Sequence, residues 1–377
     1  MIDNDTEELM MANALAGDEL ARMFCIQREL MMGKLSPICL SWLEEMAEDD
    51  DAYAQTYYCE YMLDNTPPNC DWKKVERYCK SLREEDPGTA YRLLGEMHLV
   101  EDGRVYDAAK AEMCLQKAVE LGDTDACELL ACKWKDEGHA PAEIRTLLEK
   151  IPSEHRSDCV WSLLTEVSIL AGDDEATLKY ARLRLRKNPE ATSAMLLIAY
   201  YYATGTAVRM NKETALKYYW KAANCGNALG MYYVGMMHYA GEGCRRNFSR
   251  AVDFLRRALE AGYTAASSTL ATCYILGQGV RANVSKGVEI LMDGAQDGDA
   301  NCCEQLASLY AKGSDEERNL PLAYKYILLA EKFAEGDMLS DVDSINKLKQ
   351  SIERDLTDEQ KAEVLQDFYQ KMSDMEC

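Results

Sequence analysis

The sequence lacks long apolar segments, and its cysteines lack the spacing of a metal or disulfide framework. No apolar run approaches the roughly 18 to 20 residues that a membrane-spanning helix needs, and the acidic opening MIDNDTEELM has neither the basic nor the apolar part of a signal peptide. The 15 cysteines are odd in number and include no C-x-x-C pair. We therefore expect a folded cytoplasmic protein with no membrane partner and no metal site, in which most cysteines are reduced and buried.

Positive charge is scarce in this chain. The 42 Lys and Arg residues face 65 Asp and Glu residues, which gives a formal net charge of −23. This balance argues against a nucleic-acid partner, because duplex binding needs Lys and Arg to neutralise phosphates. Residues 1–190 alone carry 22 Lys and Arg against 40 Asp and Glu. If charge guides a partner, we expect a basic protein or peptide that meets the N-terminal half.

Catalytic motifs are also missing. The chain contains no G-x-S-x-G, no G-x-x-x-x-G-K-[ST] and no H-E-x-x-H. Its G-x-G elements recur between predicted helices and do not follow strands, so they are not phosphate-binding loops. We expect no catalytic residue, no cofactor and no enzymatic activity.

What the sequence does have is a repeat with a period of 36 residues. Four glycines stand at this spacing, namely Gly205, Gly241, Gly277 and Gly313. Small residues, ring-bearing residues and asparagines recur in the same register. They are Ala199, Gly235, Ala271 and Ala307; Tyr202, His238, Tyr274 and Tyr310; and Asn211, Asn247, Asn283 and Asn319. Several independent columns in one register indicate a repeat architecture.

Each 36-residue unit is predicted to form two helices. In the first helix, a small residue lies one turn before a ring, so that a close helix contact sits beside a bulky side chain. A loop with glycine follows, such as GEGCRRN at 241–247, because glycine permits the positive φ that lets the chain leave a helix. The asparagine at the end of the loop is predicted to cap the second helix.

These units resemble Sel1-like repeats, a variant of the tetratricopeptide repeat with a longer loop between its helices. The resemblance rests on stretches such as GMMHYAGEGCRRNFSRAVDFLRRALEAG at 235–262 and ATCYILGQGVRANVSKGVEILMDGAQDG at 271–298. It implies an all-α, right-handed α-solenoid of about nine helix-turn-helix repeats with a C-terminal pair of capping helices. The first helices of the nine repeats would centre on Cys25, Cys59, Gly95, Ala131, Thr165, Ala199, Gly235, Ala271 and Ala307.

The fidelity of the repeat divides the chain into four parts. Residues 1–89 are expected to hold an N-terminal cap helix and degenerate repeats. Residues 90–191 would be Sel1-like or tetratricopeptide-like repeats that are partly degenerate, and residues 192–336 four regular repeats. Residues 337–377 read as charged capping helices, in which Thr357 and Gln360 form a capping box.

His238 is the most suggestive single residue, because it lies in MYYVGMMHYAGEG (231–243) among tyrosines and methionines that could be mistaken for a cofactor site. Its column, however, holds Tyr202, Tyr274 and Tyr310 in the other regular repeats. A position that accepts either ring favours a flat group packed between helices over a metal ligand.

The repeat register predicts which residues face a concave groove, although these side chains could instead pack partly against neighbouring helices. The predicted aromatic groove consists of Leu196, Tyr200, Leu229, Tyr232, Met236 and Tyr239, a composition typical of binding surfaces. Equivalent places farther N-terminal form the predicted acidic patch, which consists of Glu60, Asp64, Glu96, Glu128 and Glu166.

The resemblance implies a non-enzymatic adaptor or scaffold, most often bacterial, that binds a peptide or protein partner in its groove. One alternative is an immunity protein or inhibitor that neutralises a toxin, since some Sel1-like proteins have that role and negative charge suits a basic target. A second alternative is a redox or metal sensor built on the many cysteines. By itself the chain is expected to be a monomer.

Overall fold

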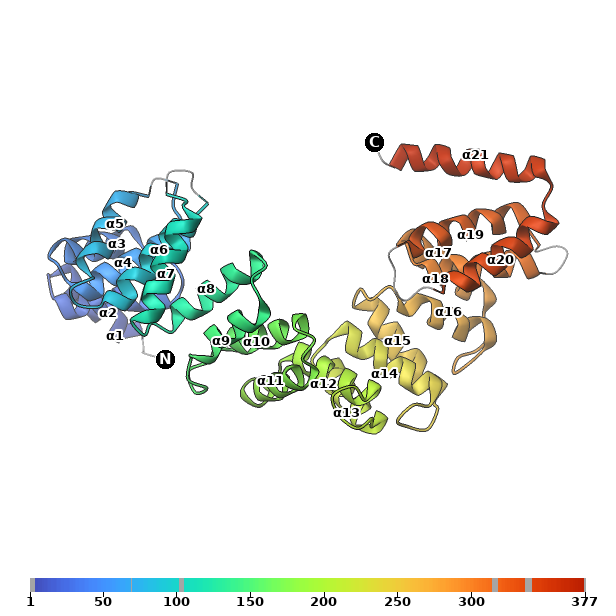
Figure 1. The fold of residues 1–377 in the computed structure, drawn as a ribbon, viewed down its shortest axis with the longest axis horizontal. Helices are drawn as coiled ribbons and strands as arrows, with labels where there is room; N and C mark the ends of the chain where they lie inside the picture. The colour runs from blue at the N-terminus through green and yellow to red at the C-terminus, as the bar shows by residue number, and fades with distance from the viewer. Residues whose placement is uncertain (1–3, 69, 102–104, 314–317, 336–340, 376–377) are drawn as a thin grey trace. The chain divides into compact units, whose positions relative to one another are not determined.

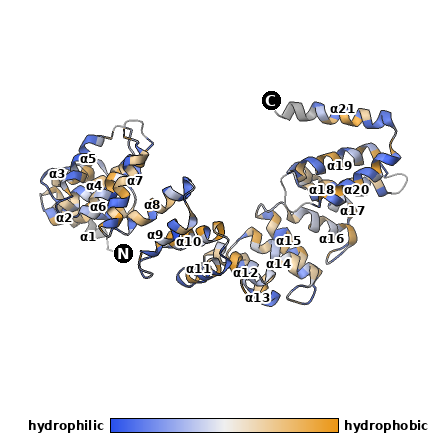
Figure 2. Ribbon diagram, in the orientation of Figure 1, coloured by the Kyte–Doolittle hydropathy of each residue, from blue (hydrophilic) through white to orange (hydrophobic). Residues whose placement is uncertain are grey.

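The structure, a computed structural model, describes residues 4–68, 70–101, 105–313, 318–335 and 341–375. All regular secondary structure in these ranges is α-helical, in 21 helices (Figure 1). The chain divides into two compact units, residues 1–173 and 174–377, called here the N-terminal unit and the C-terminal unit. Each helix carries both hydrophobic and hydrophilic residues, as amphipathic packing requires (Figure 2).

The N-terminal unit contains the first ten helices. They are α1 (Asn4–Leu15), α2 (Glu19–Met31), α3 (Pro37–Glu48), α4 (Ala52–Asn65), α5 (Trp72–Ser81), α6 (Pro87–Leu99), α7 (Ala108–Glu120), α8 (Asp125–Asp136), α9 (Pro141–Glu149) and α10 (Asp158–Leu170). Its largest core runs from Ala14 to Cys114 and includes Ile26, Leu43 and Leu93, which are fully buried.

The C-terminal unit contains the other eleven helices. They are α11 (Asp174–Lys187), α12 (Thr192–Thr204), α13 (Lys212–Asn224), α14 (Ala228–Ala240), α15 (Phe248–Glu260), α16 (Ala266–Leu276), α17 (Val284–Gln296), α18 (Ala300–Lys312), α19 (Leu320–Ala334), α20 (Val342–Asp355) and α21 (Asp358–Met375). Its main core begins at Ala199 and continues to Leu356.

The predicted repeats are confirmed as helical hairpins. The nine predicted repeat centres fall in the even-numbered helices α2 to α18. Within the units, neighbouring helices such as α6 and α7, α12 and α13, α14 and α15, and α18 and α19 pack closely along their length. The fold class predicted from the repeat is therefore correct: an all-helical chain of helix-turn-helix repeats.

The asparagine column caps helices as predicted. The Asn247 side chain accepts a hydrogen bond from the backbone N–H of Arg250 at 3.0 Å, and Asn211, Asn283 and Asn319 cap their helices in the same way. Each capping asparagine also donates its own backbone N–H to the backbone carbonyl of the ring-bearing residue in the same repeat. The four distances are 2.8 Å (Asn211 to Tyr202), 2.9 Å (Asn247 to His238), 2.8 Å (Asn283 to Tyr274) and 2.9 Å (Asn319 to Tyr310). This pair of contacts fixes the loop between the two helices of a repeat.

Two glycines in one repeat show why the small residues recur. A Cβ added at Gly235 would lie 2.8 Å from Cγ of Leu255, so glycine lets α14 approach α15 closely. Gly243, in the following loop, has φ +66° and its Cβ would lie 2.3 Å from the carbonyl oxygen of Lys212. The loop after α14 therefore passes directly over the start of α13.

The predicted C-terminal helices are present as α20 and α21. Helix α20 packs on α19 and α18, and α21 contacts α19. The predicted capping box forms: Thr357 N–H donates to Oε1 of Gln360 at 3.1 Å, and Gln360 N–H donates to Oγ1 of Thr357 at 3.3 Å. The predicted boundary at residues 336 and 337 lies outside the described residues.

Fourteen cysteines lie in the described residues, and none of these fourteen forms a disulfide bond. Ten of them are buried, as expected for small hydrophobic side chains. Throughout the helices that the structure describes, none is long and apolar enough to cross a bilayer.

Candidate functional site

The predicted acidic patch lies in the N-terminal unit, spread over four helices. Glu60 and Asp64 belong to α4, Glu96 to α6, Glu128 to α8 and Glu166 to α10. Glu128 accepts a hydrogen bond from the Ser157 hydroxyl at 3.1 Å, and Glu166 pairs with Lys135 at 2.9 Å. Glu60 and Glu96 both pair with one arginine, Arg92.

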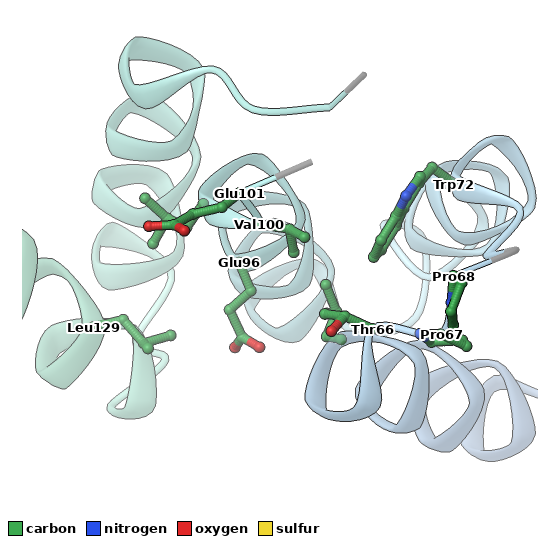
Figure 3. Close-up of a pocket in the computed structure, with 10 residues that line it drawn as sticks. Thr66, Pro67, Pro68, Trp72, Glu96, Val100, Glu101 and Leu129 are labelled. Carbon is green, nitrogen blue, oxygen red and sulfur yellow. The ribbon is translucent and has the colours of Figure 1, made fainter. Parts of the chain in front are cut away.

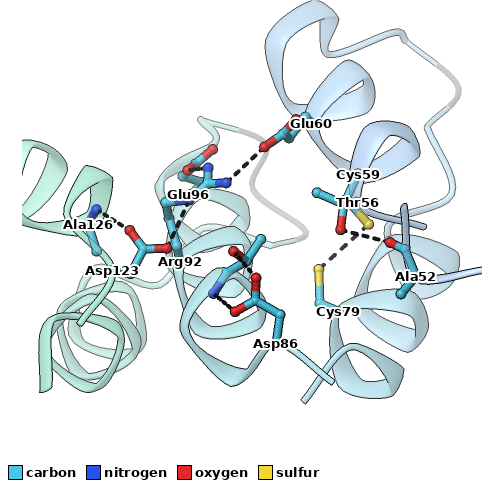
Figure 4. Close-up of polar contacts among 11 residues, drawn as sticks. Ala52, Thr56, Cys59, Glu60, Cys79, Asp86, Arg92, Glu96, Asp123 and Ala126 are labelled. Atoms are coloured by element: carbon cyan, nitrogen blue, oxygen red, sulfur yellow. Dashed lines mark hydrogen bonds and ion pairs between the residues drawn. The ribbon is translucent and has the colours of Figure 1, made fainter. Parts of the chain in front are cut away.

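Arg92 on α6 joins carboxylates from three different segments (Figure 4). Its Nη2 lies 2.8 Å from Oε1 of Glu60, its Nη1 lies 2.7 Å from Oε1 of Glu96, and its Nε lies 3.4 Å from Oδ2 of Asp123. Only 12% of the Arg92 side chain and 9% of the Asp123 side chain are exposed. We call Arg92, Glu60, Glu96 and Asp123 the Arg92 cluster.

The charges of the Arg92 cluster do not balance. Burial disfavours the charged guanidinium, but Glu96, Glu60 and Asp123 together hold the pKa of Arg92 above its ordinary value. Burial raises the pKa of Glu96, and the nearby charges of Glu60 and Asp64 add to this rise against the opposing effect of Arg92. Three carboxylates thus share one guanidinium, which leaves the Arg92 cluster with a net negative charge.

Glu96 also forms part of the wall of a cleft of about 720 Å³ (Figure 3). In the figure its carboxylate lies between Leu129 of α8 on one side and the 66–68 loop on the other. The cleft is lined by Leu63, Thr66, Pro67, Pro68, Trp72, Glu96, Leu99, Val100, Glu101 and Leu129. Its described walls are therefore mostly apolar, with two carboxylates and no basic group among the described lining residues. We call it the Glu96 cleft.

A second cleft of about 700 Å³ lies beside α4. It is lined by Gln27, Leu30, Met31, Gly33, Tyr57, Glu60, Tyr61, Asp64 and Asn65. Glu60 therefore connects this Glu60 cleft to the Arg92 cluster, and Glu96 connects the cluster to the Glu96 cleft. Both clefts combine apolar or aromatic walls with carboxylates, and in the part of the chain that the structure describes no Lys or Arg lines either cleft.

The predicted aromatic groove lies in the C-terminal unit, on α12 and α14. Tyr200 is half exposed and contacts the ring of Tyr201, with 5.7 Å between centroids. The other members are partly buried, namely Leu196, Leu229, Tyr232, Met236 and Tyr239. The groove residues therefore differ in how much surface they offer to a partner.

Tyr232 and Tyr239 each make ring contacts inside the C-terminal unit. The centroid of the Tyr232 ring lies 4.9 Å from that of Tyr263 and 5.4 Å from that of Tyr233. Burial raises the pKa of Tyr232 to about 12, with smaller contributions from Tyr263 and Tyr233. Tyr239 contacts the Phe248 ring at 5.4 Å. These side chains contribute to repeat packing, which is the alternative that the sequence left open.

His238 is 4% exposed, and its ring lies edge-on to Trp220 at 6.2 Å. The packing role predicted from its column agrees with this position. Within the part of the chain that the structure describes, no group of three His, Cys, Asp or Glu side chains is arranged to hold a metal ion.

Sequence reasoning missed three contributors to these sites. Asp123 follows Gly122 and caps α8 by accepting the N–H of Ala126 at 2.8 Å, so its pattern signals only a helix cap. Trp72 is the first residue of α5, and no repeating pattern in the sequence indicates that it lines the cleft. Cys244 lies in the loop before α15 with its Sγ 3.3 Å from Nδ1 of His238, a contact that the sequence pattern does not indicate.

The comparisons with known proteins identify the type of repeat. The family model described as Sel1 repeat matches residues 88–123, 192–227, 228–263, 268–291 and 300–332. The chain therefore contains Sel1 repeats at five positions. A comparison with curated proteins finds no match.

Two solved structures share the fold of this chain. One is a protective antigen of uropathogenic Escherichia coli with an SLR fold, with TM-score 0.68, 19% identity and coverage of 91% of this chain and 72% of that one. The other is a Sel1 repeat protein from Oxalobacter formigenes, with TM-score 0.58, 17% identity and coverage of 82% of this chain and 93% of that one. Repeats of this kind commonly mediate protein–protein interaction and typically serve as non-enzymatic scaffolds.

Proposed function

We propose that this protein is a non-enzymatic scaffold that binds a basic segment of a partner protein in the clefts of its N-terminal unit. The observation that carries the proposal is the lining of the Glu96 cleft, in which Glu96 and Glu101 stand among Leu63, Trp72 and Leu129. A Lys or Arg side chain of the partner can lay its aliphatic stem on the apolar wall and bring its charged end to a carboxylate.

The Arg92 cluster supports this choice of partner. Arg92 already occupies the inner faces of Glu60 and Glu96, so these carboxylates are held in place before the partner arrives. Fixed groups lose less side-chain entropy on binding than free ones. Because the surrounding charge stays negative, an acidic partner would be repelled and a basic one attracted.

The aromatic groove of the C-terminal unit supplies a second, apolar contact in this proposal. Tyr200 is its most accessible member, and half of its surface is free. Exposed tyrosines give large contact areas at low entropic cost, which is why they are frequent in protein interfaces. The adaptor would thus recognise charge with one unit and apolar side chains with the other.

An inhibitor that covers a basic toxin surface would use the same acidic clefts. The two roles differ in the outcome for the partner, because an inhibitor abolishes the activity of the protein it binds whereas a scaffold preserves it. An activity assay on the captured partner, with and without this chain, separates them.

The proposal is tested by selecting binders for the purified chain from a display library of short random peptides. We expect enrichment of sequences with Lys or Arg beside Leu, Phe or Met, and weaker retention as salt rises, because solvent-exposed charge pairs are screened. Enrichment of acidic or uncharged peptides would contradict the proposal. A chain with both Glu96→Gln and Glu101→Gln should lose the enrichment, whereas Glu85→Gln, on an exposed turn, should retain it.

A further inference from the structure

A cysteine and a histidine meet in the C-terminal unit, whereas both clefts belong to the N-terminal unit. The Sγ of Cys244, in the loop before α15, lies 3.3 Å from Nδ1 of His238 on α14. The His238 ring is almost fully buried, and among the described residues its Nε2 has no hydrogen-bond partner. Cys244 keeps part of its surface exposed.

The pair lines a cavity of about 600 Å³ between α13, α14 and α15. The other lining residues are Thr214, Leu216, Lys217, Tyr218, Trp220, Lys221 and Arg250. Three cationic side chains, Lys217, Lys221 and Arg250, therefore line the same cavity as the thiol, and no carboxylate is among its described lining residues. In a chain with net charge −23 this is a locally positive cavity. It suits a small anionic molecule.

The neighbouring repeats show that the fold itself does not require this pair. Counting in steps of 36, the place of His238 is taken by Tyr202 and Tyr274, and the place of Cys244 by Val208 and Val280. Both places change together in this repeat alone of the three. His98, at the same place in an upstream repeat, uses Nδ1 on the carbonyl oxygen of Val105 at 2.9 Å. The contact of an imidazole with a thiol is thus special to the 228–263 repeat.

At neutral pH the thiol of Cys244 holds its proton and the imidazole of His238, 3.3 Å away, is unprotonated, so the proton has to move as the sulfur attacks. Burial lowers the pKa of His238, and the positive charge of Arg250 lowers it further, so the imidazole is neutral and can accept a proton. Burial raises the pKa of the Cys244 thiol, against the lowering effect of Arg250. The thiol therefore needs a base within reach, because the thiolate is the nucleophile.

We propose that Cys244 is a site of reversible modification by small disulfides that carry carboxylates, with His238 as the base and Lys217, Lys221 and Arg250 as the anion-binding groups. In the reaction, Sγ of Cys244 attacks one sulfur of the disulfide and passes its proton to Nδ1 of His238. The S–S bond of the reagent breaks as the new mixed S–S bond forms. The departing thiolate then takes the proton from His238, so the reagent disulfide is the only oxidant that the step needs.

Glutathione disulfide is the probe for this site, because it is a small disulfide with several carboxylates. The intact chain is incubated with it, and the mixed disulfides are mapped by peptide mass spectrometry against time. Cys225 and Cys159 are exposed cysteines in the same chain and serve as internal references. We expect Cys244 to react at least about tenfold faster than either, as base assistance commonly provides.

Two sets of variants test the assigned roles. His238→Tyr restores the residue of the neighbouring repeats and should slow the reaction of Cys244 with both glutathione disulfide and the uncharged bis(2-hydroxyethyl) disulfide. The double variant Lys217→Gln, Lys221→Gln should slow only the reaction with glutathione disulfide. Circular dichroism checks that each variant stays helical, and the unchanged rate of Cys225 checks the reagent.

The inference is overturned if Cys244 reacts no faster than Cys225, or if His238→Tyr leaves its rate unchanged. If the double lysine variant slows the reaction of Cys244 equally with both disulfides, then the lysines do not bind the carboxylates of the reagent. Since the peptide-binding clefts lie in the other unit, the outcome of this test is independent of the scaffold proposal.

Discussion

The guanidinium of Arg92 on α6 bonds to Glu60 on α4, 32 residues earlier, with 2.8 Å between Nη2 and Oε1. The same guanidinium bonds to Glu96, one turn along its own helix, and lies against Asp123 before α8. One buried cation therefore connects three successive segments of the N-terminal unit and holds the carboxylates that border its clefts.

Replacement of Arg92 should destabilise the N-terminal unit. In Arg92→Met the carboxylates of Glu96 and Asp123 stay largely buried without a counter-ion, which we expect to cost about 3 kcal/mol of unfolding free energy. Urea unfolding followed by circular dichroism measures the loss. Arg77→Met is the matched control, because Arg77 forms an exposed pair with Glu48 that solvent screens, so its loss should be clearly smaller. Equal losses in the two variants would show that the Arg92 cluster does not connect the repeats as described.

Glu112 should make stability depend on pH at the acidic side. The hydrogen bond from Nε1 of Trp134, 2.9 Å long, lowers the pKa of Glu112 in the folded state, and Lys133 lowers it further against the effect of burial. The folded pKa lies below the unfolded value near 4.5, so this stabilisation is complete above that pH and is lost as the pH falls through the folded pKa.

The variant Glu112→Gln tests this dependence by removing the charge. At neutral pH it should be less stable than the natural chain by about 1 kcal/mol. The difference should shrink as the pH is lowered below about 4 in a series of urea unfolding curves, because the natural glutamate is then protonated as well. A difference that stays constant across the series would rule out Glu112 as a titrating contributor.

Alanine substitutions at two glycines with positive φ compare the cost of backbone strain alone with the cost of strain plus a steric clash. Gly226 has φ +83° and open space around its position, whereas Gly243 has φ +66° and the Lys212 carbonyl within 2.3 Å of its potential Cβ. Gly226→Ala should cost about 1 kcal/mol through the left-handed backbone alone. Gly243→Ala should cost roughly 3 kcal/mol or more, because the loop must also move away from α13. Thermal unfolding compares them, and a similar loss in both would contradict the close contact between loop and helix.

The tyrosines of the aromatic groove should behave differently on truncation. Tyr232→Ala removes a ring packed against Tyr263 and Tyr233, and we expect a loss of about 2 to 3 kcal/mol. Tyr200→Ala, at a half-exposed position, should lose less than about 1 kcal/mol. Urea unfolding distinguishes these values. If Tyr200→Ala proves as damaging as Tyr232→Ala, then Tyr200 is a packing residue and not a free contact surface.

The repeat fold could be predicted because it depends on short-range sequence patterns that recur in several repeats. The cap at Asn247, the ring at His238 and the small residue Gly235 each recur 36 residues on, so the register stands out against variation elsewhere. The structure then repeats the same contacts, such as the N–H of Asn247 bonded to the carbonyl of His238. Upstream repeats follow the same helices with looser sequence, because tertiary packing tolerates substitutions that keep the pattern.

The candidate sites could be predicted only in part, because they depend on contacts between repeats. Helical spacing identified Glu60 and Glu96 as neighbours on one face. It could not show that Arg92 and Asp123 would share their charge, since Asp123 comes from a turn outside the helical pattern. Cys244 likewise stands at a loop place that holds valine in neighbouring repeats, and only the structure brings its thiol to His238.

The central claim, that the Glu96 cleft binds a cationic side chain on an apolar wall, is tested most directly by the exposed carboxylate of Glu101. A selected peptide that contains one essential lysine is titrated into the natural chain, into Glu101→Gln and into the control Glu85→Gln, with fluorescence anisotropy as the readout. We predict that Glu101→Gln weakens binding about tenfold, the change expected for one charge-assisted hydrogen bond. A peptide with glutamine in place of that lysine should no longer distinguish the variant from the natural chain. Equal affinity of all three proteins for the lysine peptide would contradict the account.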